Sequence, residues 1–144
     1  MNYIKETEIL ANRLQEVIID GTWIANTNFK DQLTGTDYVL ANKKFHSFNT
    51  IAILAQHIHY YIDGIKNVFL GGDLEIRDRF SFDFEPITTQ KQWEDFLNTF
   101  WKDTEELVLL IKALPQEDLS KPFVDKKYGS YKRNIDAMIE HSYY

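Results

Sequence analysis

The sequence predicts an all-α protein, a four-helix bundle with two long connections. Apolar residues recur at spacings of three and four in four segments, as they do along one face of an α-helix. Side chains that favour helix N-caps, Thr50, Thr89 and Ser130, stand directly before three of these segments. The one stretch in which apolar and charged residues alternate is short and has no obvious partner strand. A length of 144 residues suits one hydrophobic core, so we expect a single domain over residues 1–144.

The first predicted helix covers about residues 3–19. The chain from Gly21 to residue 46 is polar and irregular, so we predict a long connection there, although segments 29–33 and 37–42 could each form a helical turn. The apolar face of the first helix consists of Leu10, Leu14, Val17 and Ile18.

The second predicted helix begins after Asn49 or Thr50 and ends at Gly71–Gly72. Segment 73–86 follows, and we expect it to be an extended crossover because its alternating pattern is too short for a stable sheet. The apolar face of this helix consists of Ile51, Leu54, Ala55, Ile58, Ile62, Ile65 and Phe69.

The third predicted helix starts with a capping-box pattern, Thr89 followed three residues later by Gln92, and Pro115 ends it. A second connection then leads to Ser130, which caps the fourth helix. The fourth helical pattern reaches Tyr144 without a glycine, a proline or another stop signal, so we expect the natural chain to be longer at its C-terminus.

Composition and charge exclude several classes of function. A net charge of −6 would repel the phosphate backbone of a nucleic acid. The first twenty residues are too charged for a signal peptide, and no apolar run approaches the roughly 18 residues that span a bilayer. The absence of cysteine excludes disulfides and thiolate ligands. We therefore expect a cytoplasmic protein that binds neither nucleic acid nor membranes.

The sequence also lacks the common catalytic and metal-binding motifs. There is no G-x-S-x-G elbow and no phosphate-binding loop, and Gly71–Gly72 follows a helix instead of opening one. Neither Glu-x-x-His nor H-E-x-x-H occurs, which argues against a ferritin-like di-iron site and a zincin mechanism. The histidines are therefore the remaining candidates for a site.

Three histidines fall on predicted helices, His57, His59 and His141, and His46 lies in the preceding loop. Imidazole is a common metal ligand, but a single helical histidine is more often a hydrogen-bonded boundary residue. Periodicity does not choose between His57 and His59, because both flank the apolar stripe of their helix. His57 and His141 could each face a cleft between helices.

Two segments carry a family resemblance: Thr50-Ile51 followed by Leu54 and His57, and the closing Glu140–Tyr144 segment, EHSYY. Together with the order and spacing of the helices, they resemble the DinB-like (YfiT-like) family of metalloproteins over essentially the whole chain. The likeness is greatest to a branch of small bacterial proteins. The resemblance implies a four-helix bundle of the DinB/YfiT-like type.

The resemblance also implies a divalent metal, zinc or nickel, with His57 and His141 as ligands. In that family a further histidine follows four residues later on the last helix, which here places the third ligand just beyond Tyr144. Two imidazoles are too few for a tight zinc site, so we expect the metal in the intact protein and not necessarily in these 144 residues alone. His59 remains a minor alternative ligand, and His46 is expected to be a solvated loop residue.

The activities that the resemblance implies are metal-dependent transfer to a low-molecular-weight thiol (S-transferase) and hydrolysis. The metal would lower the pKa of a bound water or thiol. Glu140 is a weak candidate for a general base, and the alternative is a solvated surface carboxylate. The rival hypothesis is a non-catalytic ligand-binding or interaction module with a vestigial metal site. In both cases we expect a homodimer, the commonest form of oligomer.

Overall fold

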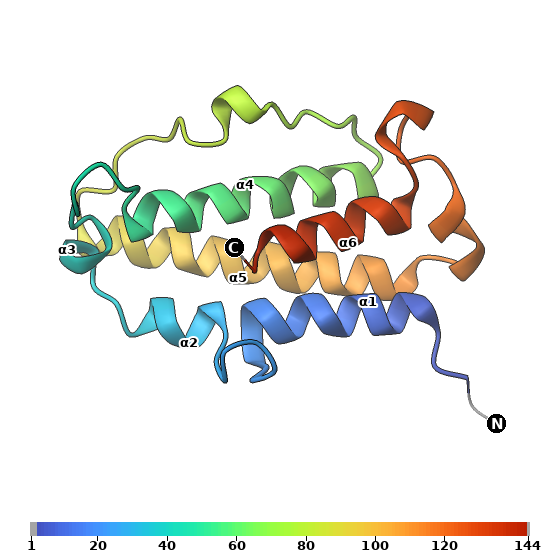
Figure 1. The fold of residues 1–144 in the computed structure, drawn as a ribbon, viewed down its shortest axis with the longest axis horizontal. Coiled ribbons are helices and arrows are strands. Elements are labelled where there is room, and N and C mark those ends of the chain that lie inside the picture. Colours follow the sequence, from blue (N-terminus) through green and yellow to red (C-terminus); the bar gives the residue numbers. More distant parts are fainter. Residues whose placement is uncertain (1–2, 144) are drawn as a thin grey trace.

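The computed structural model describes residues 3–143, which form helices and connecting loops (Figure 1). No strand occurs within this range, so the predicted all-α class is confirmed. No helix in the described part of the chain combines the length and apolar character needed to cross a membrane. The α-helices are α1 (Glu6–Gln15), α2 (Phe29–Thr34), α3 (Tyr38–Ala41), α4 (Ile51–Phe69), α5 (Gln90–Ala113) and α6 (Tyr131–His141).

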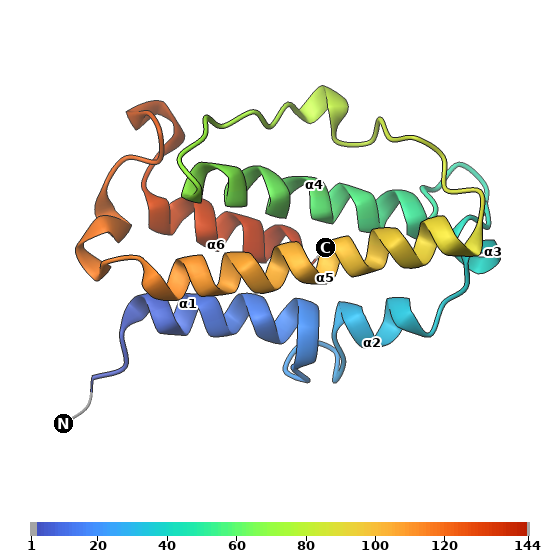
Figure 2. The same cartoon turned by 180° about the vertical axis from the view of Figure 1, so that it is seen from behind.

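Helices α1, α4, α5 and α6 lie side by side with similar axis directions (Figures 1 and 2). Both α5 and α6 contact α1 and α4, so α1 and α4 lie on opposite sides of the molecule with the other two between them. Their apolar faces form one core, because no helix of this length can hide its apolar stripe alone. The largest fully buried side chains of this core include Trp93, Phe100, Phe123, Leu14, Ile18 and Ile62.

The first long connection contains two short helices. Helix α1 first continues as a π-helical turn over Glu16–Asp20. The side chain of Asn28 then accepts a hydrogen bond from the backbone of Asp31 at 2.8 Å and caps α2. Asp37 does the same for α3, accepting from Leu40 N at 2.8 Å. The segments for which the sequence allowed a helical turn are therefore helical.

The N-caps predicted from sequence are confirmed. The hydroxyls of Thr50, Thr89 and Ser130 each accept a hydrogen bond from the backbone three residues later at 3.1 Å. The capping box differs from the standard pattern in one detail. The Gln92 side chain accepts a hydrogen bond from Thr88 N, at 2.7 Å, and not from Thr89 N. The starts of α4, α5 and α6 are thus determined by local side-chain chemistry.

The crossover between α4 and α5, residues 70–89, is mostly extended and runs along the outside of α4 (Figure 1). A 3-10 turn, Asp78–Phe80, interrupts it. Gly64 allows the crossover to approach α4 closely, because a Cβ on Gly64 would lie 2.3 Å from Cγ1 of Ile76. The Tyr60 hydroxyl accepts a hydrogen bond from Arg77 N at 2.8 Å. Packing and hydrogen bonding therefore fix the crossover against the helix.

Gly64→Ala should lower the free energy of unfolding by about 1 kcal/mol. The crowding of Ile76, typically 1–3 kcal/mol, should exceed the gain of roughly 1 kcal/mol from replacing a helical glycine by alanine. Urea unfolding would measure the difference. Gly35→Ala is the matched control, because its new Cβ would lie 3.6 Å from the nearest atom and its φ is −79°. A Gly64→Ala protein as stable as the control would contradict the close packing of the crossover.

Candidate functional site

Helices α4 and α6 bring the imidazoles of His57 and His141 into direct contact. Their Nε2 atoms are 3.0 Å apart, and the ring centroids are separated by 4.8 Å. Both residues are partly buried. The two histidines selected by the sequence pattern, 84 residues apart in the chain, therefore form one histidine pair.

The backbone of the crossover orients the His57 ring. Nδ1 of His57 lies 2.8 Å from the carbonyl oxygen of Ser81. A carbonyl only accepts hydrogen bonds, so we assign the proton of neutral His57 to Nδ1. Nε2 of His57 then carries a lone pair and accepts from the Nε2–H of His141. A backbone carbonyl that holds the second nitrogen in this way is the usual support of a metal-binding histidine.

Side chains of the crossover complete the walls of the site. Phe82 stacks on the His57 ring, with centroids 4.0 Å apart and an angle of 6° between the planes. The rings of Tyr61, on α4, and His141 meet edge to face with centroids 4.6 Å apart, and the Tyr61 hydroxyl donates to Asp78 Oδ1 at 2.7 Å. These contacts could not be predicted from the sequence, because the apolar alternation of the crossover marks Phe82 but not the neighbouring carbonyl of Ser81 and carboxylate of Asp78.

Burial and the neighbouring His57 hold the pKa of His141 below its usual value of 6.5, although the Asp78 carboxylate acts in the opposite direction. The neutral form of His141 is therefore favoured in the folded protein. A neutral imidazole is also the form that binds metals.

The separation of the two nitrogens fits a shared metal ion. Two imidazole nitrogens bound to one zinc or nickel ion at about 2.0–2.1 Å lie roughly 2.8–3.4 Å apart at ligand angles of about 90–110°. The observed distance between Nε2 of His57 and Nε2 of His141, 3.0 Å, is within this range. The third ligand expected just beyond Tyr144 lies outside the described residues.

His59 does not join this pair. It is two residues beyond His57 on α4, which turns it about 200° around the helix toward α5. Its Nε2 lies 2.6 Å from Asp103 Oδ2, and His59, Asp63 and Asp103 together could hold a metal ion. Burial raises the pKa of Asp103, but hydrogen bonds from His59 and Lys66 outweigh this effect and lower it below the usual range. The alternative ligand therefore belongs to a separate cluster.

The two remaining sequence candidates lie on the surface. His46 is exposed in the loop before α4, as expected. Glu140 is also exposed, and it lines a surface hollow with Lys132, Arg133 and Asp136. Adjacent positions on a helix do not face each other, so Glu140 is directed away from the neighbouring His141.

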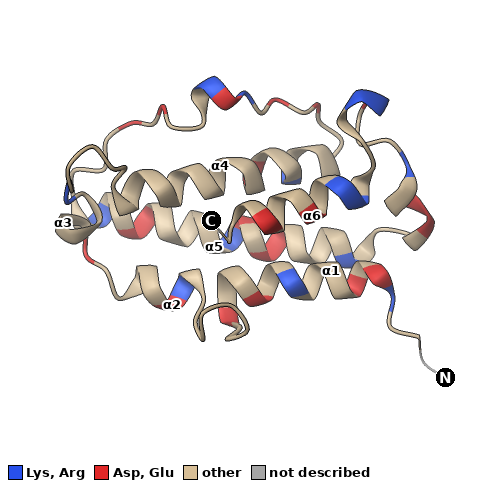
Figure 3. Ribbon diagram, viewed as in Figure 1, with Lys and Arg blue, Asp and Glu red and all other residues tan. Residues whose placement is uncertain are grey.

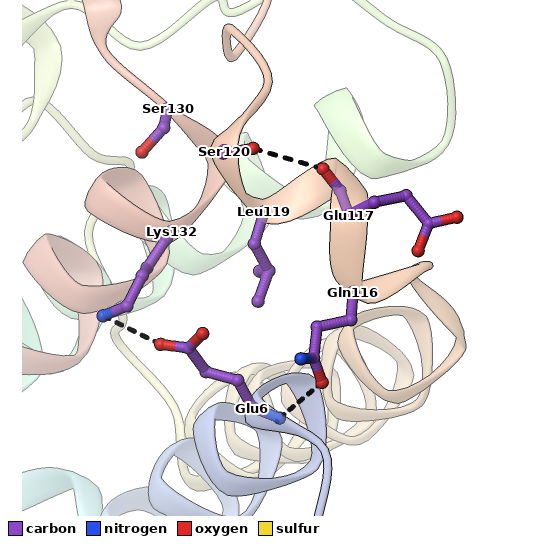
Figure 4. A pocket seen from close by; sticks show the side chains of 7 residues that line it. All are labelled: Glu6, Gln116, Glu117, Leu119, Ser120, Ser130 and Lys132. Atoms are coloured by element: carbon purple, nitrogen blue, oxygen red, sulfur yellow. Dashed lines mark hydrogen bonds and ion pairs between the residues drawn. The ribbon is translucent and has the colours of Figure 1, made fainter.

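Two further hollows differ in character. One of about 670 Å³ lies between the start of α1 and the start of α6, where Lys132 pairs with Glu6 and Gln116 accepts from Glu6 N (Figure 4). None of its lining residues is a histidine. The other, of about 370 Å³, is mainly apolar and includes Ser142 and Tyr143, which directly follow His141. Its apolar lining includes Val17, Ile24, Phe29, Leu33 and Ile51.

The fold and the site define an all-helical protein with a partly buried histidine pair whose geometry suits a divalent metal ion. No protein-family model, curated protein or solved structure matches the chain.

The lowered pKa of His141, caused by burial and then by the neighbouring His57, predicts a pH dependence of stability in the metal-free protein. Because the folded-state pKa of His141 is below 6.5, the unfolded chain binds more protons at acidic pH. The free energy of unfolding should be highest above about pH 6.5 and fall as the pH is lowered through the folded-state pKa. Urea unfolding between about pH 7.5 and 5 measures this slope.

His141→Gln should flatten that slope, whereas His46→Gln, a change in the exposed loop, should leave it unchanged. Parallel profiles for wild type and His141→Gln would show that His141 does not titrate differently in the folded state.

Proposed function

We propose that this protein is a DinB-like four-helix-bundle metalloprotein that holds zinc or nickel between His57 and His141. The observation that carries the proposal is the 3.0 Å separation of their Nε2 atoms, with Nδ1 of His57 on the Ser81 carbonyl. A second support is independent of geometry, because the resemblance to the DinB-like family implies the same two histidines as ligands.

The residues around the pair would prepare it for the metal. The Ser81 carbonyl holds His57 in the tautomer whose Nε2 is free to bind. Phe82 and Tyr61 cover the two imidazoles and reduce their contact with water. The Asp78 carboxylate, held by the Tyr61 hydroxyl at 2.7 Å, places a negative charge on the same side of α4. Such a charge favours the binding of a cation at the histidine pair.

The reaction that we propose is S-transfer to a low-molecular-weight thiol or hydrolysis. A divalent ion would lower the pKa of a bound thiol or water and so supply a nucleophile near neutral pH. The apolar hollow beside Ser142 and Tyr143 would accommodate the apolar part of the substrate. A turnover screen with low-molecular-weight thiols and with esters, with and without a chelator, tests the activity.

His57→Ala and His141→Ala should each lower zinc affinity by at least about tenfold, since each removes one of two nitrogen ligands. Isothermal titration calorimetry with Zn²⁺ and Ni²⁺ measures the affinity. The ring ¹⁵N signals assign the site, because the chain has only four histidines. Zinc should shift the signals of His57 and His141 and leave that of His46 in place.

The control variant is His46→Ala, which removes an imidazole from the exposed loop and should bind zinc like the wild type. If both pair variants also bind zinc like the wild type, the proposed site is wrong. If zinc binds at the pair but no thiol or ester is turned over, the enzymatic part of the proposal fails and metal binding remains.

A second candidate function is a non-catalytic dimeric module with a vestigial metal site. Exposed apolar side chains on and after α3 favour it, because such surfaces often mark protein contacts. A monomer in light scattering would exclude this candidate, and turnover that a chelator abolishes would exclude its non-catalytic character. The exposed side chains, between 46% and 68% accessible, are Val39, Leu40, Phe45 and Phe48.

A further inference from the structure

A second polar cluster lies between α4 and α5, on the side of α4 away from the histidine pair. Helix α4 contributes His59, Asp63 and Lys66, whose spacing of four and three places them on one helical face. Helix α5 contributes Asp103 and Glu106, three residues apart. We call these five residues the α4–α5 cluster. Asp63 and Lys66 are the only Asp, Glu, Lys or Arg residues in α4 (Figure 3).

The inner part of the α4–α5 cluster is tightly bonded, and its outer part is open to solvent. The side chain of Asp103 is 11% exposed. Its Oδ2 lies 2.6 Å from His59 Nε2, and its Oδ1 lies 2.7 Å from Lys66 Nζ. Lys66 also contacts Glu106 at 3.1 Å. Asp63 is 55% exposed and approaches Lys66 only to 4.0 Å. Asp63 is therefore directed toward the cluster without a close partner in it.

The cations around the cluster do not balance its carboxylates. Lys66 faces Asp63, Asp103 and Glu106. One further ammonium, that of Lys102, lies 4.0 Å from Glu106 and is 75% exposed. Two ammonium groups against three carboxylates leave an excess negative charge before His59 is counted. Such an excess is unfavourable in a partly buried position, so binding of a cation there would be favourable.

The possible donor atoms of the α4–α5 cluster lie close together. His59, Asp63 and Asp103 each offer one ligand atom, and these atoms lie within 4.8 Å of one another. Ligands of a common ion at about 2.0–2.2 Å lie roughly 3 Å apart. One ion would therefore require a rotation of the Asp63 side chain, which is 55% exposed. The ion would take the place of the hydrogen bond that now joins His59 and Asp103.

We propose that His59, Asp63 and Asp103 form a second divalent-metal site, independent of the His57–His141 pair. Lys66 would hold Asp103 Oδ1 and so direct Oδ2 at the ion. One imidazole and two carboxylates form an oxygen-rich ligand set that is open to solvent beside Asp63. Such a set suits harder divalent ions, of which Mn²⁺ is the representative.

The test is a Mn²⁺ titration of the full chain. Binding is measured by electron paramagnetic resonance, as the loss of the signal of free Mn²⁺. Asp63→Asn should weaken Mn²⁺ binding by at least about tenfold, because it removes an anionic ligand. Since Asp63 is exposed, this variant should fold like the wild type. Glu105→Gln is the matched control, because it removes one exposed carboxylate from α5 outside the cluster.

A second readout separates this site from the histidine pair. Mn²⁺ should raise the thermal unfolding midpoint of the wild type and of the double variant His57→Ala/His141→Ala, but not that of Asp63→Asn. The proposal is overturned if Asp63→Asn binds Mn²⁺ like the wild type, or if the double variant loses Mn²⁺ binding. Failure of zinc binding at the His57–His141 pair would leave these results unchanged.

Discussion

The contact between Ile76 and Gly64 determines where the crossover lies, and the histidine pair depends on that position. Without a side chain at residue 64, the crossover approaches α4 closely enough for Ile76 to pack directly on the helix. The Ser81 carbonyl then reaches His57, and Phe82 covers the same ring. The orientation of one imidazole is thus set by a segment that belongs to no long helix.

Helix α4 has polar groups on two opposite sides of its apolar stripe. On one side His57 meets α6 and the crossover, and on the other His59 meets Asp103 of α5. The first side presents two nitrogens beneath aromatic rings, whereas the second presents one nitrogen and two carboxylates near solvent. Because the ligand types differ, the proposed sites would prefer different metals. The nitrogen pair would prefer zinc or nickel, and the side with two carboxylates would prefer a harder ion such as Mn²⁺.

The fold could be predicted from sequence because its signals are local. Apolar spacing and capping hydroxyls determine where α4, α5 and α6 begin, and each cap forms within three residues of its own position. The π-helical turn after α1 could not be predicted in this way, because it adds to the apolar pattern without interrupting it. The short α2 and α3 were allowed by the sequence but have too few residues to show a clear period.

The candidate site could be predicted only in part. The family resemblance implied His57 and His141, but helical periodicity alone could not separate His57 from His59, since both flank the stripe of α4. The choice depends on which neighbour each one meets, Ser81 of the crossover or Asp103 of α5. Those partners lie 24 and 44 residues away in the chain, and no local rule connects them with the histidines.

The ion pairs of Lys66 bear on how the proposed metal sites would relate to folding. In small zinc domains the ion is the main source of folding energy, so the chain unfolds when the ion is removed. Here an ammonium group that is part of the chain already bridges α4 and α5 through Asp103 and Glu106. This link between the two helices does not require a metal, so an ion at either proposed site would enter a scaffold that is already folded.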